Sequence, residues 1–377
     1  MLPVFEQPDG TFLRAGFTTG TCAAAAARAA TYLLFNRGQQ LTEVEVALPA
    51  GFSITLPLAW AERGTDFVRC AVQKEAGDDP DITDRVLVVA EAKLASSGIT
   101  LSAGAGVGRV TLAGLAVSPG EPAINPVPRA QILQAVMDVL PEGQGVEITV
   151  SIPGGEELAS RTLNPSLGIV GGLSILGSTG LVEPMSATAF WRSLLPQLDV
   201  ALSAGHRRVV LVPGKMGRRN AERLLPVAPE AVVVMGNFVG HLLEACAARD
   251  IQEVILCGHI GKMVKVAGGI ADTHSNVADA RREILVAHAA LAGLSPQVLC
   301  SLMSHNTAEE SAQYLLCHGY SQVLVSVAEA AARRAEIMAK GKLRAGCLLL
   351  DLQGRVLAAE AWTAGLLLNK GDKSENG

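Results

Sequence analysis

The sequence predicts an α+β domain followed by a Rossmann-like α/β domain with a parallel sheet. Three observations support this fold class. The 377 residues are enough for two or three domains. Short strand-like runs alternate with two helical stretches in the first half, and after Ser186 β-branched apolar runs alternate with helices. We expect the first domain at residues 1–185, the Rossmann-like domain at 186–278, and helices with a β-hairpin at 279–377 that pack back on both.

The first domain is expected to combine two helices with an antiparallel sheet. Residues 21–37 are rich in alanine, the best helix former, and Gly38 is a stop signal. Residues 126–140 place their apolar side chains on one helix face. Short alternating runs bounded by Pro, Gly and Asp predict strands at residues 44–48, 53–58, 67–72, 85–90 and 146–152.

The second domain contains three short, unbroken apolar runs, at residues 209–212, 231–235 and 253–257. Such runs are typical of parallel strands that are buried on both faces. A doubly wound sheet binds ligands at the carboxyl ends of its strands. Those ends are Pro213-Gly214-Lys215, Gly236-Asn237 and Gly258-His259.

The last segment is expected to be mainly helical. Helices are predicted at residues 279–291 and 326–340, and Thr307 with Glu310 forms a capping-box pattern that opens another. Residues 344–351 and 355–360 predict a β-hairpin. The polar tail at residues 369–377 is expected to be disordered.

The composition of the chain limits the classes of partner that we expect the protein to bind. A net charge of −5 argues against a nucleic-acid binder. Seven cysteines without a C-x-x-C pair indicate reduced thiols in the cytoplasm and no zinc site. The first ten residues lack the regions of a signal peptide, and residues 165–182 are too rich in glycine for a membrane helix. We therefore expect a cytoplasmic protein with no metal of its own and no membrane partner, and a homo-oligomer is left open.

The segment from Gly16 to Cys22 brings threonine hydroxyls to the start of a helix. Free N–H groups and the helix dipole at that point favour an anion such as a carboxylate. The alternative is a capped helix in which alanines allow close packing. Cys22 is then a packed small residue, whereas an exposed first turn would give its thiol a lowered pKa.

The segment from Lys74 to Asp84 contains five carboxylates. They suit a hard metal site, a general base, or contacts to cationic or hydroxyl groups of a ligand. The alternative is a solvated acidic turn.

Two further segments are rich in glycine. Residues 104–109 match only the front of a dinucleotide-binding fingerprint, which makes a weak cofactor motif. Residues 164–180 hold many glycines, which let backbone lie close against a flat ligand or a cofactor. The alternative for this second segment is a set of tight turns.

The segment from Gly258 to Ser275 carries two lysines and two histidines. Lys262 and Lys265 are three residues apart and share a helix face, where they would clamp carboxylates. His259 and His274 are candidates for acid–base groups or axial ligands of a metal in the substrate. The alternative for each histidine is a hydrogen-bonded structural role.

Taken together, these segments resemble the CbiD family, the cobalt-precorrin-5B (C1)-methyltransferases of anaerobic cobalamin biosynthesis. The resemblance rests on GFTTGTCAAAAA, KEAGDDPDIT, GVGRVT with AINPVPR, NPSLGIVGGLSILGSTGLVEPMS and GHIGKMVKVAGGIADTHS, which occur in the family's order. Glu75 departs from an expected aspartate, and residues 214–217 match loosely.

The resemblance implies transfer of a methyl group from S-adenosylmethionine to C1 of cobalt-precorrin-5B, giving cobalt-precorrin-6A. It also implies a fold unlike the other methyltransferases of the pathway, with an anionic tetrapyrrole substrate that brings the cobalt. Two alternatives are weighed against it. One is a nicotinamide-dependent oxidoreductase, which lacks a full G-x-G-x-x-G here. The other is a non-catalytic tetrapyrrole carrier, which would not bind S-adenosylmethionine.

The resulting hypotheses assign residues to three roles. The catalytic candidates are Asp79 and Asp81. Substrate carboxylates are expected at Thr18, Thr19, Thr21, Cys22, Arg109, Arg129, Lys262, Lys265 and His274. S-adenosylmethionine is expected at Gly171, Gly172, Ser178, Thr179, Gly236, Asn237, Gly258 and His259.

Overall fold

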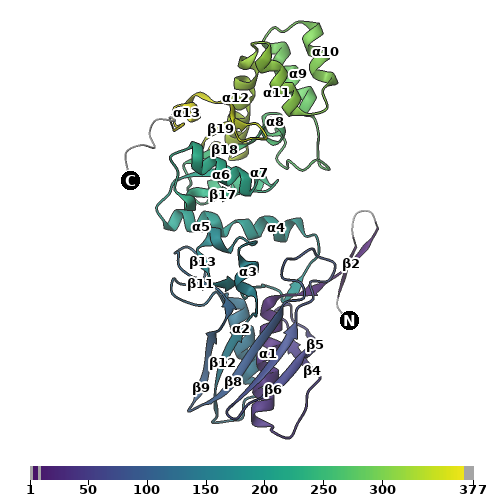
Figure 1. Cartoon of the computed structure of the whole chain (residues 1–377), viewed down its shortest axis with the longest axis vertical. Coiled ribbons are helices and arrows are strands. Elements are labelled where there is room, and N and C mark those ends of the chain that lie inside the picture. The colour runs from purple at the N-terminus through teal and green to yellow at the C-terminus, as the bar shows by residue number, and fades with distance from the viewer. Residues whose placement is uncertain (1–2, 7–9, 369–377) are drawn as a thin grey trace. The chain divides into compact units, whose positions relative to one another are not determined.

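The computed structural model describes residues 3–6 and 10–368, so the predicted polar tail lies outside the described residues. The chain forms two compact units, Met1–Ala189 and Phe190–Gly377, which we call the first and the second unit (Figure 1). Within the described residues, no helix combines the length and the apolar character needed to cross a membrane.

The first unit is built on a five-stranded sheet in the order β6-β7-β8-β12-β9. Its strands are β6 (Trp60–Arg63), β7 (Phe67–Gln73), β8 (Leu87–Ala95), β12 (Gly145–Ser151) and β9 (Gly98–Ala103). Three neighbouring pairs are antiparallel as predicted, but β12 and β9 are parallel. The reason is topological: β8 and β9 run in opposite directions and β12 lies between them, so β12 can be antiparallel to only one of the two.

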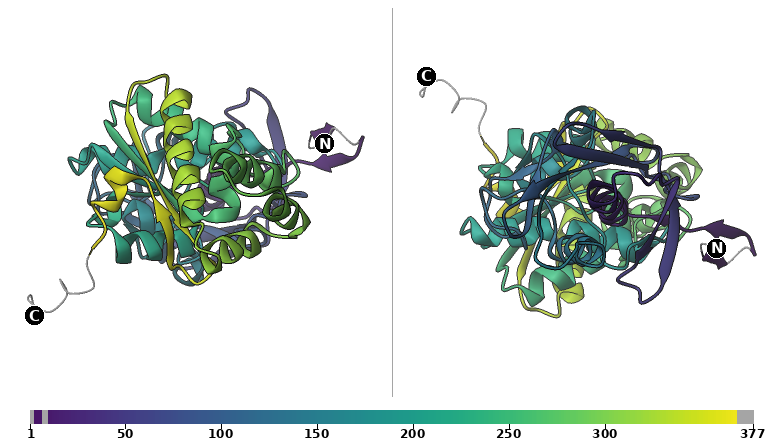
Figure 2. Two further views of the ribbon diagram at one scale, coloured as in Figure 1. Left: turned by 90° about the horizontal axis from the view of Figure 1, so that it is seen from above. Right: turned by 90° about the horizontal axis from the view of Figure 1, so that it is seen from below.

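Helix α1 (Thr19–Phe35) packs with α2 (Pro126–Met137) against this sheet, and Figure 2 shows α1 nearly end-on from below. Alanines 23–27 are fully buried, and their small side chains allow the helix to approach its neighbours closely. The helix begins two residues before the predicted start because Thr18 is its N-cap, with Oγ1 accepting the N–H of Thr21.

Short strand pairs bring the glycine-rich segments to the start of α1. They are β3 (Gly16–Phe17) with β15 (Leu181–Val182), β10 (Gly106–Val107) with β14 (Gly172–Leu173), and β11 (Arg109–Val110) with β13 (Ile169–Val170). The other elements of this part are β1 (Val4–Glu6), β2 (Phe12–Arg14), β4 (Glu43–Ala47), β5 (Ser53–Pro57), α3 (Gly155–Ala159) and the 3-10 turn Asn164–Leu167.

The second unit is built on a sheet in the order β17-β16-β18-β19-β20. Its strands are β16 (Arg208–Val212), β17 (Val232–Val234), β18 (Glu253–His259), β19 (Arg344–Leu350) and β20 (Val356–Ala359). The first four in this order are parallel and β20 is antiparallel to β19. The predicted hairpin therefore exists, and through β19 it extends the parallel sheet beside β18.

Helices connect these parallel strands. α6 (Lys215–Leu224) follows β16, α7 (Val239–Ala248) follows β17, and α8 (Ile260–Ala267) follows β18. Four more helices then precede β19, namely α9 (Arg281–Leu291), α10 (Pro296–Ser304), α11 (Ala308–Cys317) and α12 (Ser321–Met338). α12 packs on α8 and β19, as the view from above shows (Figure 2). The remaining elements are α4 (Ala187–Leu194), α5 (Pro196–Ser203), the 3-10 turn Pro229–Ala231 and α13 (Ala361–Ala364).

The predicted capping pattern at Thr307 is confirmed. Its Oγ1 accepts the N–H of Glu310 at 3.1 Å and starts α11. Helix α12 starts at Ser321, five residues before the predicted Ser326, because Gly319 with a φ of 77° ends α11 and the chain turns directly into the next helix.

Candidate functional site

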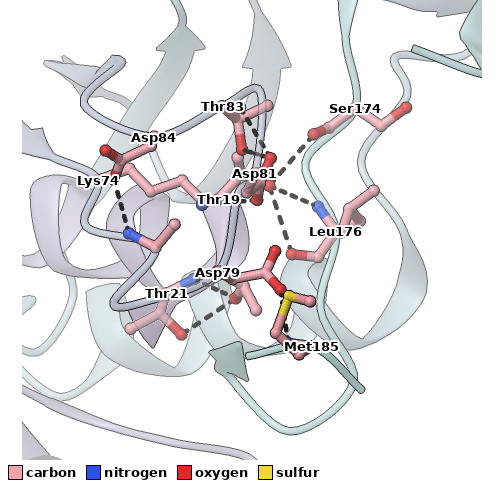
Figure 3. A network of polar contacts seen from close by, with 12 residues as sticks. Thr19, Thr21, Lys74, Asp79, Asp81, Thr83, Asp84, Ser174, Leu176 and Met185 are labelled. Atoms are coloured by element: carbon pink, nitrogen blue, oxygen red, sulfur yellow. Dashed lines mark hydrogen bonds and ion pairs between the residues drawn. The ribbon is translucent and has the colours of Figure 1, made fainter. Parts of the chain in front are cut away.

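The acidic segment of the first unit is organised around a buried lysine. Lys74 is only 1% exposed, and its Nζ lies 2.8 Å from Oδ2 of Asp81 (Figure 3). The other carboxylate oxygen of Asp81 accepts the N–H and the hydroxyl of Thr83, each at 2.8 Å. Burial acts to raise the pKa of Asp81, but the Lys74 ammonium and the Thr83 donors outweigh it and hold this pKa below its usual value.

Three other carboxylates of the segment contact backbone or a surface arginine. Asp79 accepts the N–H of Met185 at 2.9 Å, and Asp84 accepts the N–H of Ala76 at 2.8 Å. Asp78 pairs with Arg14 at 3.1 Å. Residues 3–6 and 10–368 contain no group of three or more His, Cys, Asp or Glu side chains arranged to hold a metal ion. The carboxylates thus mainly stabilise the turn, and Asp79 and Asp81 lie on the same loop.

The threonines at the start of α1 bond to the glycine-rich segment. Thr19 Oγ1 donates to the carbonyl of Ser174 at 3.2 Å and accepts the N–H of Leu176 at 2.9 Å (Figure 3). Thr21 Oγ1 donates to the carbonyl of Gly180 at 2.8 Å. Thr18, Thr19 and Thr21 are all buried. This is the arrangement of the capped and closely packed helix, and the substrate role of these hydroxyls stays a prediction.

Cys22 lies in the same enclosed turn. Its side chain is fully buried, and burial raises the pKa of its thiol to about 12. The hypothesis of a thiol with a lowered pKa is therefore wrong, because the helix start is covered and not solvated. Cys22 packs as a small apolar residue.

The glycines of residues 164–180 allow backbone to pack against backbone. A Cβ on Gly172 would lie 2.3 Å from backbone atoms of Gly106, and a Cβ on Gly177, whose φ is +132°, would lie 2.4 Å from Thr18 Oγ1. Gly171, Ser178 and Thr179 are exposed and remain accessible to a ligand. The two glycine segments of the first unit thus meet each other.

The two predicted arginines have different surroundings. Arg109 is exposed, and its guanidinium donates to the carbonyl of Gly120. Arg129 is half-buried near the start of α2.

In the second unit, His259 and Glu309 form a pair at the carboxyl end of β18. His259 is the N-cap of α8, and its Nδ1 accepts the N–H of Gly261 at 3.1 Å. Since Nδ1 is an acceptor, the hydrogen of the neutral ring is on Nε2, which donates to Oε2 of Glu309 at 2.9 Å. Both ring nitrogens of His259 are therefore engaged, and Glu309 is held at the strand end.

The two lysines of α8 follow His259 closely in the sequence, but they differ in environment. Lys262 is half-buried and its Nζ donates to Oδ1 of Asn237 at 2.6 Å. Burial, followed by the nearby Lys265 ammonium, lowers the pKa of Lys262. Lys265 is 3% exposed and donates to the carbonyl of Thr273 at 3.1 Å. Of the predicted pair, only Lys262 is accessible to a ligand.

The remaining candidates of the second unit lie around these residues. His274 is exposed and its Nδ1 accepts the N–H of Asn276. Gly236 has a φ of +60° in the turn before Asn237. Gly258 is buried, and a Cβ there would lie 3.0 Å from the ring of Pro213.

Sequence reasoning did not identify Glu309 or the aromatic rings near Asn237. Glu309 lies 50 residues from His259 in the chain, and a helix N-terminal glutamate is common, so no local signal marks it. The rings of Phe190 and Phe238 lie 5.8 Å apart, and Trp191 stacks on His241 at 4.7 Å. Because only 4% of the residues in this chain are aromatic, the presence of these rings in the sequence was the signal that could have pointed to them.

Comparison with known proteins gives consistent matches. The CbiD family model matches residues 6–184, and the model of the CbiD C-terminal domain matches residues 272–361. The cobalt-precorrin-5B C(1)-methyltransferase of Moorella thermoacetica is 48% identical over 92% of this chain and 95% of its own length. Proteins of the same name from Desulfitobacterium hafniense and Methanocaldococcus jannaschii are 47% and 40% identical over 92% of this chain and 89% and 96% of theirs.

A solved structure also matches. It is the crystal structure of the cobalamin biosynthesis protein CbiD from Archaeoglobus fulgidus, which is 31% identical. The match covers 70% of this chain and 83% of that one, with a TM-score of 0.39.

Proposed function

Because the chain belongs to the CbiD family, we propose that it transfers a methyl group from S-adenosylmethionine to C1 of cobalt-precorrin-5B, giving cobalt-precorrin-6A. The observation that supports this most strongly is the 48% identity to the methyltransferase of Moorella thermoacetica across 95% of that protein. Cobalt enters as part of the substrate.

The reaction needs few catalytic groups from the protein. The ring carbon supplies the electron pair of the new C–C bond, and the sulfur keeps the pair of the S–CH₃ bond that breaks. No protein nucleophile takes part, so the enclosed Cys22 thiol is compatible with the reaction. The protein must instead hold the ring carbon against the methyl group at a near-attack distance of roughly 3–3.5 Å.

We propose different roles for the two catalytic candidates. Both oxygens of Asp81 are engaged, by Lys74 and by Thr83, so Asp81 positions the loop. Asp79 is half-buried and bonds the backbone N–H of Met185, and it is the carboxylate we assign to the sulfonium or to a ring proton. Asp79→Asn and Asp81→Asn variants with undiminished turnover would remove both assignments.

The tetrapyrrole carries several carboxylates and needs cationic partners. We propose Arg129 and Arg109 for this role in the first unit. Substrate binding is then supported only indirectly by Thr18, Thr19, Thr21 and the packed Cys22. The hydroxyls of Thr19 and Thr21 bond to the carbonyls of Ser174 and Gly180, and so place the segment that exposes Ser178 and Thr179. The seven free thiols support a reducing compartment such as the cytoplasm.

We also propose that the second unit is Rossmann-like. Its parallel strands follow the order β17-β16-β18-β19. The strand that comes first in the chain, β16, therefore lies inside the sheet, and the next one, β17, lies at the edge beside it. Doubly wound sheets of this order bind ligands where the order reverses, at the carboxyl ends of the first and third strands. In this unit that point lies between the ends of β16 and β18.

Mass spectrometry of cobalt-precorrin-5B incubated with the purified protein and S-adenosylmethionine tests the reaction. We expect a gain of one methyl group that is absent when S-adenosylmethionine is omitted. If no methyl group is gained while the tetrapyrrole stays tightly bound, the protein is a carrier and the proposal is wrong.

A further inference from the structure

We infer that S-adenosylmethionine binds within the second unit, with its α-carboxylate on Lys262 and its ribose hydroxyls on Glu309. The inference rests on the proposed function for the identity of the ligand. It reassigns Lys262 from the tetrapyrrole to S-adenosylmethionine and adds Glu309, and it replaces the glycines of the first unit as the predicted cofactor contact.

The location follows from the topology and from the space at the strand ends. The carboxyl ends of β16 and β18 form the reversal point of the sheet. Gly214 follows β16, and a Cβ built on it meets no atom within 4 Å. The backbone there borders open space. By contrast, Gly172 of the first unit packs against Gly106, which leaves no room for a ligand between them.

Lys262 is suited to a small anion because its charge is not neutralised. Its partner Asn237 is a neutral amide, and the Lys265 ammonium nearby adds positive charge. Lys265 itself is enclosed and bonded to Thr273, so it strengthens the field without reaching the ligand. Asp272 is the acidic group that acts on Lys262 in the opposite sense. A carboxylate would bind here with a charge-assisted hydrogen bond.

Glu309 supplies an acceptor of fixed direction. The Nε2–H of His259 holds one carboxylate oxygen at 2.9 Å, and the side chain of Glu309 is 17% exposed. His259 cannot act as a free base in this arrangement, because its Nδ1 accepts the N–H of Gly261. An acidic residue that accepts the ribose hydroxyls is the usual solution in doubly wound nucleotide-binding sheets.

Aromatic rings border the end of the neighbouring strand β17, where the Lys262 partner Asn237 lies. Phe238 directly follows Asn237, and Phe190, which is 54% exposed, lies against it. A Cβ on Gly236 would lie 3.4 Å from the ring of Phe190, so these rings cover the turn after β17. An exposed aromatic face attracts both a planar adenine and a sulfonium cation. The lysine, the glutamate and the aromatic rings together match the carboxylate, the ribose, and the adenine and sulfonium of S-adenosylmethionine.

Isothermal titration of the full chain with S-adenosylhomocysteine tests the inference without turnover. We expect Lys262→Gln and Glu309→Gln each to weaken binding about 10- to 100-fold, the range for loss of a hydrogen bond to a charged group. Lys342→Gln, at an exposed lysine of the same unit, is the matched control and should leave binding unchanged. Glu309→Gln keeps the size of the side chain and an acceptor for His259, so it also controls for misfolding.

The outcomes separate the two proposals. If the wild-type protein does not bind S-adenosylhomocysteine at all, the proposed function fails. If it binds and both variants bind equally well, only the present inference fails. A parallel titration with cobalt-precorrin-5B covers the other assignment: if Lys262→Gln weakens that binding alone, Lys262 serves the tetrapyrrole and the inference is overturned.

Discussion

Lys74 in the first unit is buried and Lys262 in the second is half-buried, and the two ammonium groups have partners of different charge. Lys74 is 2.8 Å from the Asp81 carboxylate, so the pair is neutral. Lys262 bonds the neutral Asn237 and lies near a second ammonium, so its site keeps positive charge. A fold is destabilised when a buried lysine loses its carboxylate, whereas a half-buried lysine that bonds a neutral amide keeps its charge for an anionic ligand.

The same contrast holds for the hydroxyl and carboxylate groups. The hydroxyls of Thr19 and Thr21 donate their hydrogen bonds to backbone carbonyls of residues 174–180. Glu309 has one oxygen held by His259 and remains partly exposed. We therefore expect substitutions in the first unit's network to lower stability, and substitutions at the strand ends of the second unit to lower ligand binding with little effect on stability.

The largest effect is expected for Asp81→Ala. It leaves the Lys74 ammonium buried without its carboxylate, which costs about 3–5 kcal/mol of unfolding free energy. Urea unfolding measures this. Asp78→Ala is the matched control in the same loop, because its ion pair with Arg14 is exposed to solvent and should contribute much less to stability. Equal losses in the two variants would contradict the role of the buried pair.

Thr19→Val is expected to cost about 1–3 kcal/mol, because it leaves the N–H of Leu176 without its acceptor in a part-buried site. Thr19→Ser keeps the hydroxyl and should retain most of the stability. The same urea unfolding experiment compares the two. A valine variant as stable as the wild type would show that these contacts do not hold the segment.

The pH dependence of stability tests the Asp81 ion pair separately. The pKa of Asp81 is lowered in the folded state, so its contribution is complete above the unfolded value of about 3.9 and is lost as pH falls through the folded pKa. The stability difference between wild type and Asp81→Asn should therefore be constant near neutrality and shrink in acid. A difference that stays constant down to about pH 2 would rule out an ionised Asp81 as its source.

For Glu309→Gln, a loss of stability below about 1 kcal/mol is expected, because the amide oxygen still accepts from His259. Thermal unfolding without ligand measures it. If this variant is as unstable as Asp81→Ala, Glu309 belongs to the fold in the same way as the first unit's network, and the contrast between the units disappears.

The prediction with the smallest effect on the structure concerns the rates at which the thiols are labelled at neutral pH. Cys300 and Cys317 are exposed and should react quickly with a disulfide reagent, whereas Cys22 should react only after unfolding, because burial raises its pKa to about 12. A variant with serine at positions 300 and 317 should lose the fast phase. A fast phase that persists and maps to Cys22 would mean that the start of α1 opens readily.

Much of the fold was predictable because the signals are local. The apolar runs at 209–212 and 253–257 became β16 and β18, and the alanine run became α1. The family and the reaction also followed from the motifs of the sequence. These features depend on residue type, spacing and order along the chain, which a sequence contains in full.

Other features depended on contacts between distant residues. The pairing of Thr19 with Leu176 spans 157 residues, and that of His259 with Glu309 spans 50. Periodicity and propensity describe neighbours within a few turns, so they could not tell that the threonines are enclosed or that β9 runs parallel to β12. By itself, therefore, the sequence determined the elements and the kind of chemistry. Only the tertiary structure decided which polar groups bond within the fold and which remain accessible to a ligand. The reason is that the burial of a group depends on the segments that pack against it, and these can be distant in the sequence.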